Sequence, residues 1–151
     1  MIAEAPTVHA SAVLVGARAV LIRGPAGAGK SRLAFDLINA ADAGLLMFAR
    51  LVADDCVHLE ACKGRLLARP PDSLAGLLEV RGSGIRLLPH EPVAVIGLVI
   101  DLAVPGAGRL PADAERETTI AGIELPRLAV ADGADALPQV LAHFRTAPAR
   151  V

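Results

Sequence analysis

Hydrophobic residues in this chain occur mainly in short runs separated by Gly, Pro or charged residues, a pattern typical of buried β-strands. The runs lie at residues 11–15, 19–23, 51–53, 77–80, 93–104 and 123–130. Residues 11–15 and 19–23 are close enough to form a hairpin, and residues 56–71 predict another that turns at Lys63-Gly64. The run at 93–104 is the most apolar, so we expect it to be a central strand.

Two segments show helical spacing instead of short apolar runs. The first begins at Ser31 and is expected to end near Gly44, because Gly is a natural helix C-cap. Its apolar face comprises Leu33, Ala34, Leu37 and Ile38. The second runs from Ala134 to Arg145, while residues 106–119 are expected to form a polar loop. Many strands and few helices predict a single α/β domain over residues 1–151 with a mixed, not purely parallel, sheet.

Composition narrows the range of functions. Apolar residues make up 54% of the 151 residues and the formal net charge is −1, so the chain lacks the basic character of nucleic-acid-binding proteins. The apolar run at 93–100 is too short to span a bilayer, and the N-terminus lacks a basic signal-peptide region. We therefore expect a cytoplasmic protein with no membrane or nucleic-acid partner, in which Cys56 and Cys62 are reduced thiols.

The sequence GPAGAGKS at residues 24–31 matches the phosphate-binding pattern G-x-x-x-x-G-K-[ST]. Glycines let backbone N–H groups turn toward phosphate oxygens, and the following helix N-terminus adds its positive dipole end. The strand before the loop and the helix after it favour a site for a nucleoside triphosphate with Mg²⁺ over a merely structural turn. The candidate nucleotide-binding residues are Gly24, Pro25, Ala26, Gly27, Ala28, Gly29, Lys30, Ser31 and Arg32.

Charged residues near two strand ends are candidates for the remaining chemistry. Asp54 and Asp55 follow an apolar strand, where a carboxylate can hold Mg²⁺ or its water. Neighbouring residues on an extended chain point opposite ways, so one could face the metal and the other an acceptor hydroxyl. Glu79 and Arg81 project from one face of the strand at 77–80, and Glu79 is a candidate second metal ligand. Taken alone, Asp54 and Asp55 are equally well explained as a solvated turn, and Glu79 and Arg81 as a surface ion pair.

Two more residues are weaker candidates. Arg109, in the polar loop, could stabilise a transferring phosphoryl group, although a solvated loop arginine explains it as well. His9 precedes the first strand, where a single histidine is more often structural.

Considered together, several stretches resemble one known family. The segments TVHASAVLV, VLIRGPAGAGKS, LVADDCV, LEVRGSGI, GRLP and LPRLAV occur in this order between residues 7 and 130. They are similar to the catalytic domain of HPr kinase/phosphorylase, the enzymes that phosphorylate the phosphocarrier protein HPr on a serine. The resemblance implies a fold related to phosphoenolpyruvate carboxykinase, ATP and Mg²⁺ as cofactors, HPr as substrate and a homo-oligomer, hexameric in the family.

The resemblance also implies roles for individual residues. Asp55 would accept the proton of the substrate serine, with Lys30, His9 and Arg109 as further catalytic residues. The residues implied near the metal are Ser31, Asp54 and Glu79.

The sequence departs from the family pattern at both ends. The family's N-terminal domain and its C-terminal Pro- and Arg-rich stretch have no match here, which implies a short form and leaves dephosphorylation of HPr open. Two alternatives remain: a P-loop kinase of a small metabolite, and a non-catalytic ATP-binding regulatory module. The carboxylate of Asp55 discriminates against the module, which has no use for a base beside a metal site.

Overall fold

The structure, a computed structural model, describes residues 6–108 and 113–149. Its strands are β1 (Thr7–Val8), β2 (Ser11–Val15), β3 (Arg18–Arg23), β4 (Ala49–Ala53), β5 (Val57–Cys62), β6 (Arg65–Arg69), β7 (Leu77–Val80), β8 (Gly84–Leu87), β9 (Ala94–Val104), β10 (Glu117–Ile120) and β11 (Ile123–Ala131). Its helices are α1 (Lys30–Asp42) and α2 (Ala136–Arg145), with short 3₁₀ turns η1 (Asp72–Leu74) and η2 (Asp113–Arg116).

Strand β9 is the centre of the main sheet, as its apolar sequence predicts. The sheet order is β1-β5-β6-β9-β3-β2-β4, and β11 also pairs with β9 and carries β10 at its outer edge. Strand β9 runs parallel to β3 and β11 but antiparallel to β6, so the sheet is mixed. The expected α/β class is therefore confirmed.

Gly97 shifts the register in the middle of β9. Ala19 of β3 lies opposite Ile96, whereas Val20 lies opposite Leu98, so Gly97 has no partner on β3. An unpaired residue of this kind changes which face the following side chains occupy. Accordingly Ile96 packs into one core of the protein and Leu98 into the other.

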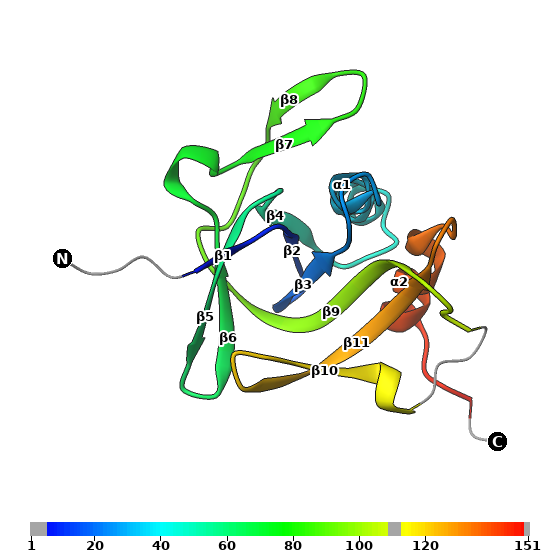
Figure 1. Ribbon diagram of the computed structural model, residues 1–151. Helices are drawn as coiled ribbons and strands as arrows, with labels where there is room; N and C mark the ends of the chain where they lie inside the picture. The colour runs from blue at the N-terminus through cyan, green and yellow to red at the C-terminus, as the bar shows by residue number, and fades with distance from the viewer. Residues whose placement is uncertain (1–5, 109–112, 150–151) are drawn as a thin grey trace.

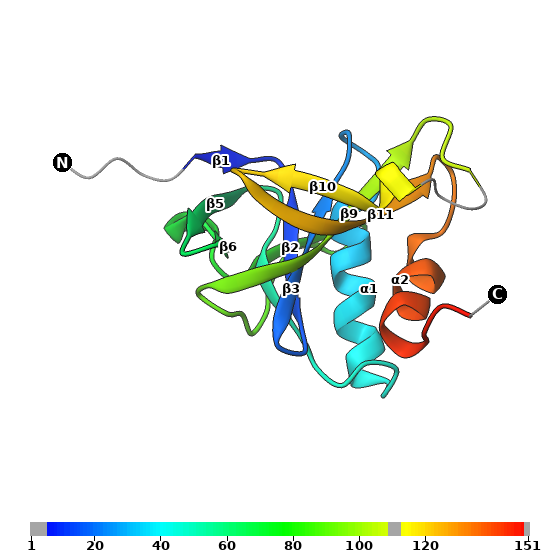
Figure 2. The same ribbon diagram turned by 90° about the horizontal axis from the view of Figure 1, so that it is seen from below.

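The two cores lie on opposite faces of the sheet. Helices α1 and α2 lie side by side over one face, and the β5–β6 hairpin folds away from them (Figures 1 and 2). The helical side buries Leu33 and Leu37 of α1 and Val140 of α2, because the apolar stripe of each helix faces the sheet. On the other side, Leu59 and Leu66 of the hairpin pack against Val99 of β9.

Three parallel strands bring the functional segments to one edge. Because β3, β9 and β11 run in the same direction, their carboxyl ends lie together. The Gly-rich loop follows β3, and the turn into α2 follows β11. In open α/β sheets this edge is the usual place for a ligand.

Most of the predicted elements are present. The predicted turn at Lys63-Gly64 has φ values of 52° and 77°, the positive pair that a tight two-residue hairpin needs. Three strands differ from the prediction. Strands β1 and β8 were not predicted, because β1 has only two residues and every residue of β8 is exposed. Strand β10 lies inside the segment expected to be a loop, because its polar residues pair with β11.

No helix within the described residues is long and apolar enough to cross a membrane.

Candidate active site

The Gly-rich loop joins β3 to α1 and leaves the first turn of the helix open. Gly29 is the helix N-cap with φ 97° and no side-chain cap, and the first turn carries no acidic residue. The amide N–H groups there are therefore available for an anion, and the helix dipole favours one. A Cβ on Gly24 would lie 3.1 Å from Cβ of Leu102, so the start of the loop sits tightly against β9.

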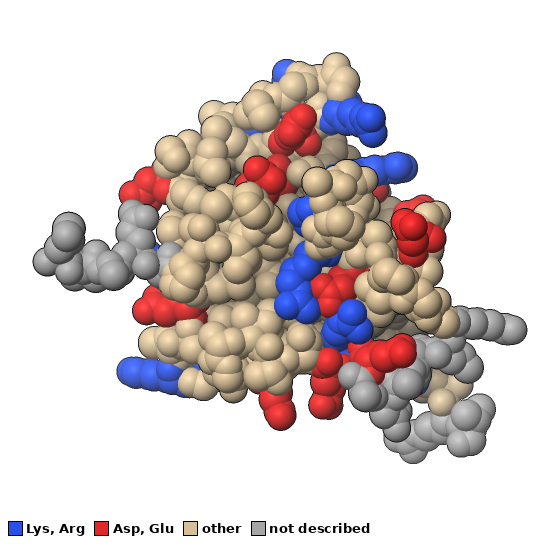
Figure 3. Space-filling model, viewed as in Figure 1, with Lys and Arg blue, Asp and Glu red and all other residues tan. Residues whose placement is uncertain are grey.

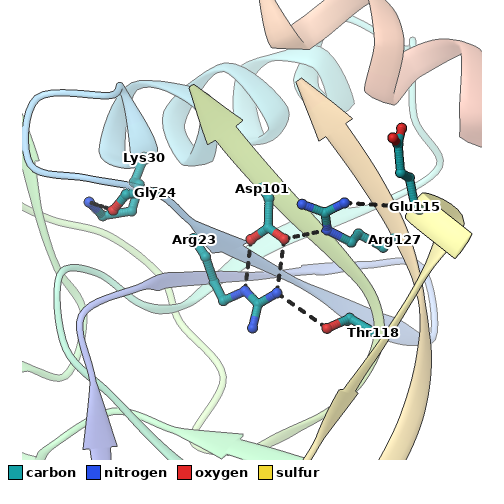
Figure 4. Close-up of polar contacts among 7 residues, drawn as sticks. All are labelled: Arg23, Gly24, Lys30, Asp101, Glu115, Thr118 and Arg127. Atoms are coloured by element: carbon teal, nitrogen blue, oxygen red, sulfur yellow. Dashed lines mark hydrogen bonds and ion pairs between the residues drawn. The ribbon is translucent and has the colours of Figure 1, made fainter. Parts of the chain in front are cut away.

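Lys30 folds back over this loop. Its Nζ donates a hydrogen bond to the carbonyl oxygen of Gly24 at 2.8 Å (Figure 4). A second hydrogen bond goes to the carbonyl oxygen of Pro25 at 3.1 Å. The ammonium group thereby stays at the mouth of the loop, where a phosphate would otherwise meet only backbone amides. Lys30 also lines the cleft next to the loop.

Asp54 is the buried centre of the site. Its side chain is one of two polar groups fully or nearly fully buried among the described residues, and it is 7% exposed. Oδ1 accepts hydrogen bonds from the hydroxyls of Ser31 and Ser11, both at 2.7 Å. Oδ2 accepts the backbone N–H of Glu79 at 3.2 Å. This one carboxylate therefore connects β2, the start of α1 and β7.

Asp55, the next residue, lies at the cleft. It is exposed and lines the cleft wall, with φ 67°, a left-handed conformation that aspartate tolerates better than most residues. The two carboxylates therefore differ in burial, and the difference coincides with a turn at Asp55 rather than with strand alternation. Glu79 and Arg81 of the β7–β8 hairpin line the same cleft.

A third wall of the cleft was not predicted from the sequence. It consists of Leu102 and Ala103 at the end of β9 and residues 130–136, the turn from β11 into α2. Only the parallel pairing of β3, β9 and β11 places these segments beside the loop, and that pairing has no signature in the residues themselves. Asp135 at this wall caps α2 by accepting the N–H of Leu137.

A charged network lies between α1 and the β10–β11 hairpin, on a face where acidic and basic side chains adjoin (Figure 3). Arg23, the residue before the loop, donates to both oxygens of Asp101 on β9, at 2.7 and 2.9 Å. Arg127 of β11 donates to Oδ2 of Asp101 and to the carbonyl of Glu115, and Thr118 lies within 3.5 Å of Arg23 (Figure 4). Burial alone would raise the pKa of Asp101, but the hydrogen bonds and charges of the two arginines outweigh it and hold the pKa below its ordinary value.

The remaining predicted site residues are only partly brought together. Arg32 lines the cleft but is largely exposed, 3.9 Å from Asp36. Burial, together with the nearby Asp135, raises the pKa of Asp36 against the opposing effect of Arg32. His9 is exposed and is not part of the cleft wall, so its predicted role gains no support from its position. Arg109 lies outside the described residues.

The donor set around Asp54 fits a cation that keeps its water and phosphate ligands. Within residues 6–108 and 113–149, no group of three or more His, Cys, Asp or Glu side chains could enclose a metal. Mg²⁺ in nucleotide sites needs no such group, because one or two carboxylates and a loop Ser hydroxyl suffice beside the phosphates. Ser31 and Asp54, which are joined by a hydrogen bond, could supply that pair, and Glu79 lines the cleft together with Ser31.

Comparison with known proteins gives consistent results. A family model described as HPr Serine kinase C-terminal domain matches residues 1–88. Proteins named HPr kinase/phosphorylase from Geobacillus thermodenitrificans and Clostridium beijerinckii are 36% and 40% identical to this chain over 143 and 77 residues. These alignments cover 83% and 51% of this chain but 43% and 23% of the relatives, so the chain spans less than half of their length.

A solved structure agrees with these sequence matches. The structure described as the Hpr(Ser) kinase/phosphatase from Coxiella burnetii superposes with a TM-score of 0.72 and 26% identity. The match covers 92% of this chain and 93% of that one, so the shared fold extends over nearly the whole chain. Because the family model spans more than half of the sequence and the fold agrees over nearly all of it, the chain belongs to the HPr serine kinase C-terminal domain family.

Proposed function

We propose that this chain transfers the γ-phosphoryl group of ATP to a serine of HPr, using Mg²⁺. The names of its relatives suggest the substrate and the reaction. The observation that carries the proposal is the arrangement at the end of β4, where Asp54 is buried against Ser31 and the neighbouring Asp55 is exposed in the cleft. A protein that only bound nucleotide would have no use for the second carboxylate in that position.

In the proposed reaction, the serine hydroxyl oxygen forms a bond to the γ-phosphorus, and the bond from that phosphorus to the β,γ-bridging oxygen breaks. ADP leaves with the electron pair of the broken bond, and Asp55 takes the hydroxyl proton on its carboxylate. A positioned carboxylate contributes about 10²–10⁴-fold to the rate of such a step. Mg²⁺, when bound, supplies charge neutralisation at the β- and γ-phosphate oxygens.

The other residues of the cleft would bind and orient the reactants. Lys30 would exchange its hydrogen bonds to the loop carbonyls for phosphate oxygens, while Ser31 and Asp54 would hold the cation. Ser31 donates its proton to Asp54, which leaves the hydroxyl lone pairs free for a metal. Glu79 and Arg81 line the same cleft, where they would contact the cation and the substrate segment. His9 and Arg109 stay proposed catalytic residues on the resemblance alone.

The proposal includes a homo-oligomer. Ile85 and Leu87 of β8 are 63% and 77% exposed, on a hairpin that stands away from the main sheet (Figure 1). Neighbouring apolar side chains this exposed favour burial against another protein surface. Light scattering during gel filtration measures the state directly, and a monomer at micromolar concentration would contradict this part of the proposal.

The kinase is tested with purified chain, Mg²⁺, γ-labelled ATP and HPr, beside HPr whose target serine is replaced by Ala. We expect label on unmodified HPr alone. Lys30→Ala should abolish the transfer, and Lys63→Met, which alters the other lysine of the chain at the β5–β6 turn, should leave it unchanged. No label on HPr despite measurable ATP binding would reject HPr as substrate and favour a small-metabolite kinase or a nucleotide-binding module.

A further inference from the structure

Ser11 is a buried hydroxyl that the proposed reaction does not use. Its relative exposure is 0%, and its Oγ donates to Oδ1 of Asp54 at 2.7 Å. Among the described residues, Asp54 is the acceptor that this hydroxyl reaches. A buried polar side chain with one partner is held there by that partner, because its alternative is an unsatisfied group.

The strand register explains why Ser11 meets Asp54. Strands β2 and β4 are antiparallel, and Ala12 lies opposite Ala53, so the residue before Ala12 faces the residue after Ala53. The register then shifts between Ala12 and Val13, which leaves Val52 without a partner on β2. Irregularities of this kind occur next to active sites, where they redirect a side chain. Here the shift ends immediately before the two aspartates.

Asp54 is held from three directions, but only one contact lies outside the cleft machinery. Ser31 belongs to the phosphate loop and Glu79 to the hairpin across the cleft, so both are expected to adjust when nucleotide binds. Ser11 lies in β2, which pairs with β3 on one side and β4 on the other within the main sheet. It is therefore the contact that fixes Oδ1 when the other two change.

We propose that Ser11 is a positioning residue that holds the Asp54 carboxylate in the orientation that receives the Mg²⁺ of the bound nucleotide. The inference rests on the proposed function, because it concerns the same metal and the same loop. Outer partners of metal-binding groups commonly affect metal affinity by 10–100-fold. Without the Ser11 hydroxyl, Oδ1 keeps only Ser31, the group that must itself serve the cation.

The test measures binding of a fluorescent non-hydrolysable ATP analogue during Mg²⁺ titration, without any turnover. Ser11→Ala should raise the Mg²⁺ concentration for half-maximal binding by about tenfold. Binding of the analogue in EDTA should not change. Ser11→Thr, which restores the hydroxyl, should return the Mg²⁺ dependence to within about twofold of the original protein. Ser73→Ala, at an exposed serine of η1, is the matched control and should show no change.

The outcomes separate this inference from the proposed function. If the unmodified protein binds the analogue with no Mg²⁺ dependence, both are overturned. If it depends on Mg²⁺ and Ser11→Ala has the same dependence with only a lower melting temperature, Ser11 is merely structural and this inference alone fails. Ser11→Cys fills the site with a weaker hydrogen-bond donor, so it provides the measurement if the Ala variant does not fold. An unshifted Mg²⁺ titration in the Cys variant overturns the inference equally.

Discussion

Replacing Asp101 with Asn tests the charged network beneath the Gly-rich loop. The carboxylate accepts hydrogen bonds from Arg23 and Arg127, which approach from the strands on either side of β9. Asn keeps the shape but removes the charge and presents an NH₂ group to one of the guanidinium groups. Two arginines on the strands that flank β9 would then face each other without a counter-ion.

The cost follows from the burial of the three side chains. Asp101 is 14% exposed, while Arg127 is 19% and Arg23 34% exposed. Breaking a fully buried charge pair costs about 3–5 kcal/mol, and hydrogen bonds to charged groups contribute about 1.5–3 kcal/mol. Water reaches Arg23 and recovers part of this, so we expect Asp101→Asn to lower the free energy of unfolding by about 2–4 kcal/mol. For a chain of this size that is a fall in melting temperature on the order of 10 °C.

Urea unfolding followed by circular dichroism measures this change as a function of pH. The folded-state pKa of Asp101 lies below its unfolded value, so its contribution is complete above the unfolded pKa and is lost as pH falls through the folded pKa. The difference between the two proteins should stay constant from about pH 5.5 to 8 and shrink below about pH 4. Glu124→Gln, at an exposed position of β11, is the control and should change stability by less than about 0.5 kcal/mol. A loss this small for Asp101→Asn, or one that does not shrink in acid, would refute the reasoning.

Two further predictions concern stability. Asp36→Asn should modestly raise the melting temperature at pH 7, because burial raises the pKa of Asp36 and disfavours its ionised form in the folded protein. Calorimetry should show this gain in melting temperature vanishing as the pH falls below about 4, and a lower melting temperature at pH 7 would contradict the prediction. Gly97→Ala should lower the free energy of unfolding by about 1–3 kcal/mol, because a Cβ there would lie 2.9 Å from Cβ and Cδ of Arg18. Chemical denaturation measures this change, and an unchanged midpoint would show that Arg18 moves aside freely.

The parts of the site predicted from sequence are those whose residues carry a local signal. The Gly-rich loop is recognisable because its glycines and lysine have fixed spacing, and the turn at Lys63-Gly64 because Gly favours the positive φ that it needs. Asp54 and Asp55 could be identified as candidates because they follow an apolar strand. Their different roles were expected from alternation, whereas the structure separates them by burial and a turn.

The parts that were missed depend on contacts between distant segments. Arg23, Asp101 and Arg127 are far apart in sequence and meet only because three parallel strands align them. The same pairing brings residues 130–136 to the cleft. Ser11 gives no signal as part of a strand, and only the register with β4 places its hydroxyl on Asp54.

The most direct test of the account is a single-turnover measurement of phosphoryl transfer from ATP to HPr by Asp55→Asn. The account predicts ATP affinity within about twofold of the original protein and a transfer rate lower by about 10²–10⁴-fold. Asp72→Asn, at an exposed aspartate of η1, should transfer at the original rate. Transfer by Asp55→Asn at an undiminished rate, with phosphoserine on HPr confirmed by mass spectrometry, would contradict the assignment of Asp55 as the proton acceptor and with it the reading of this cleft.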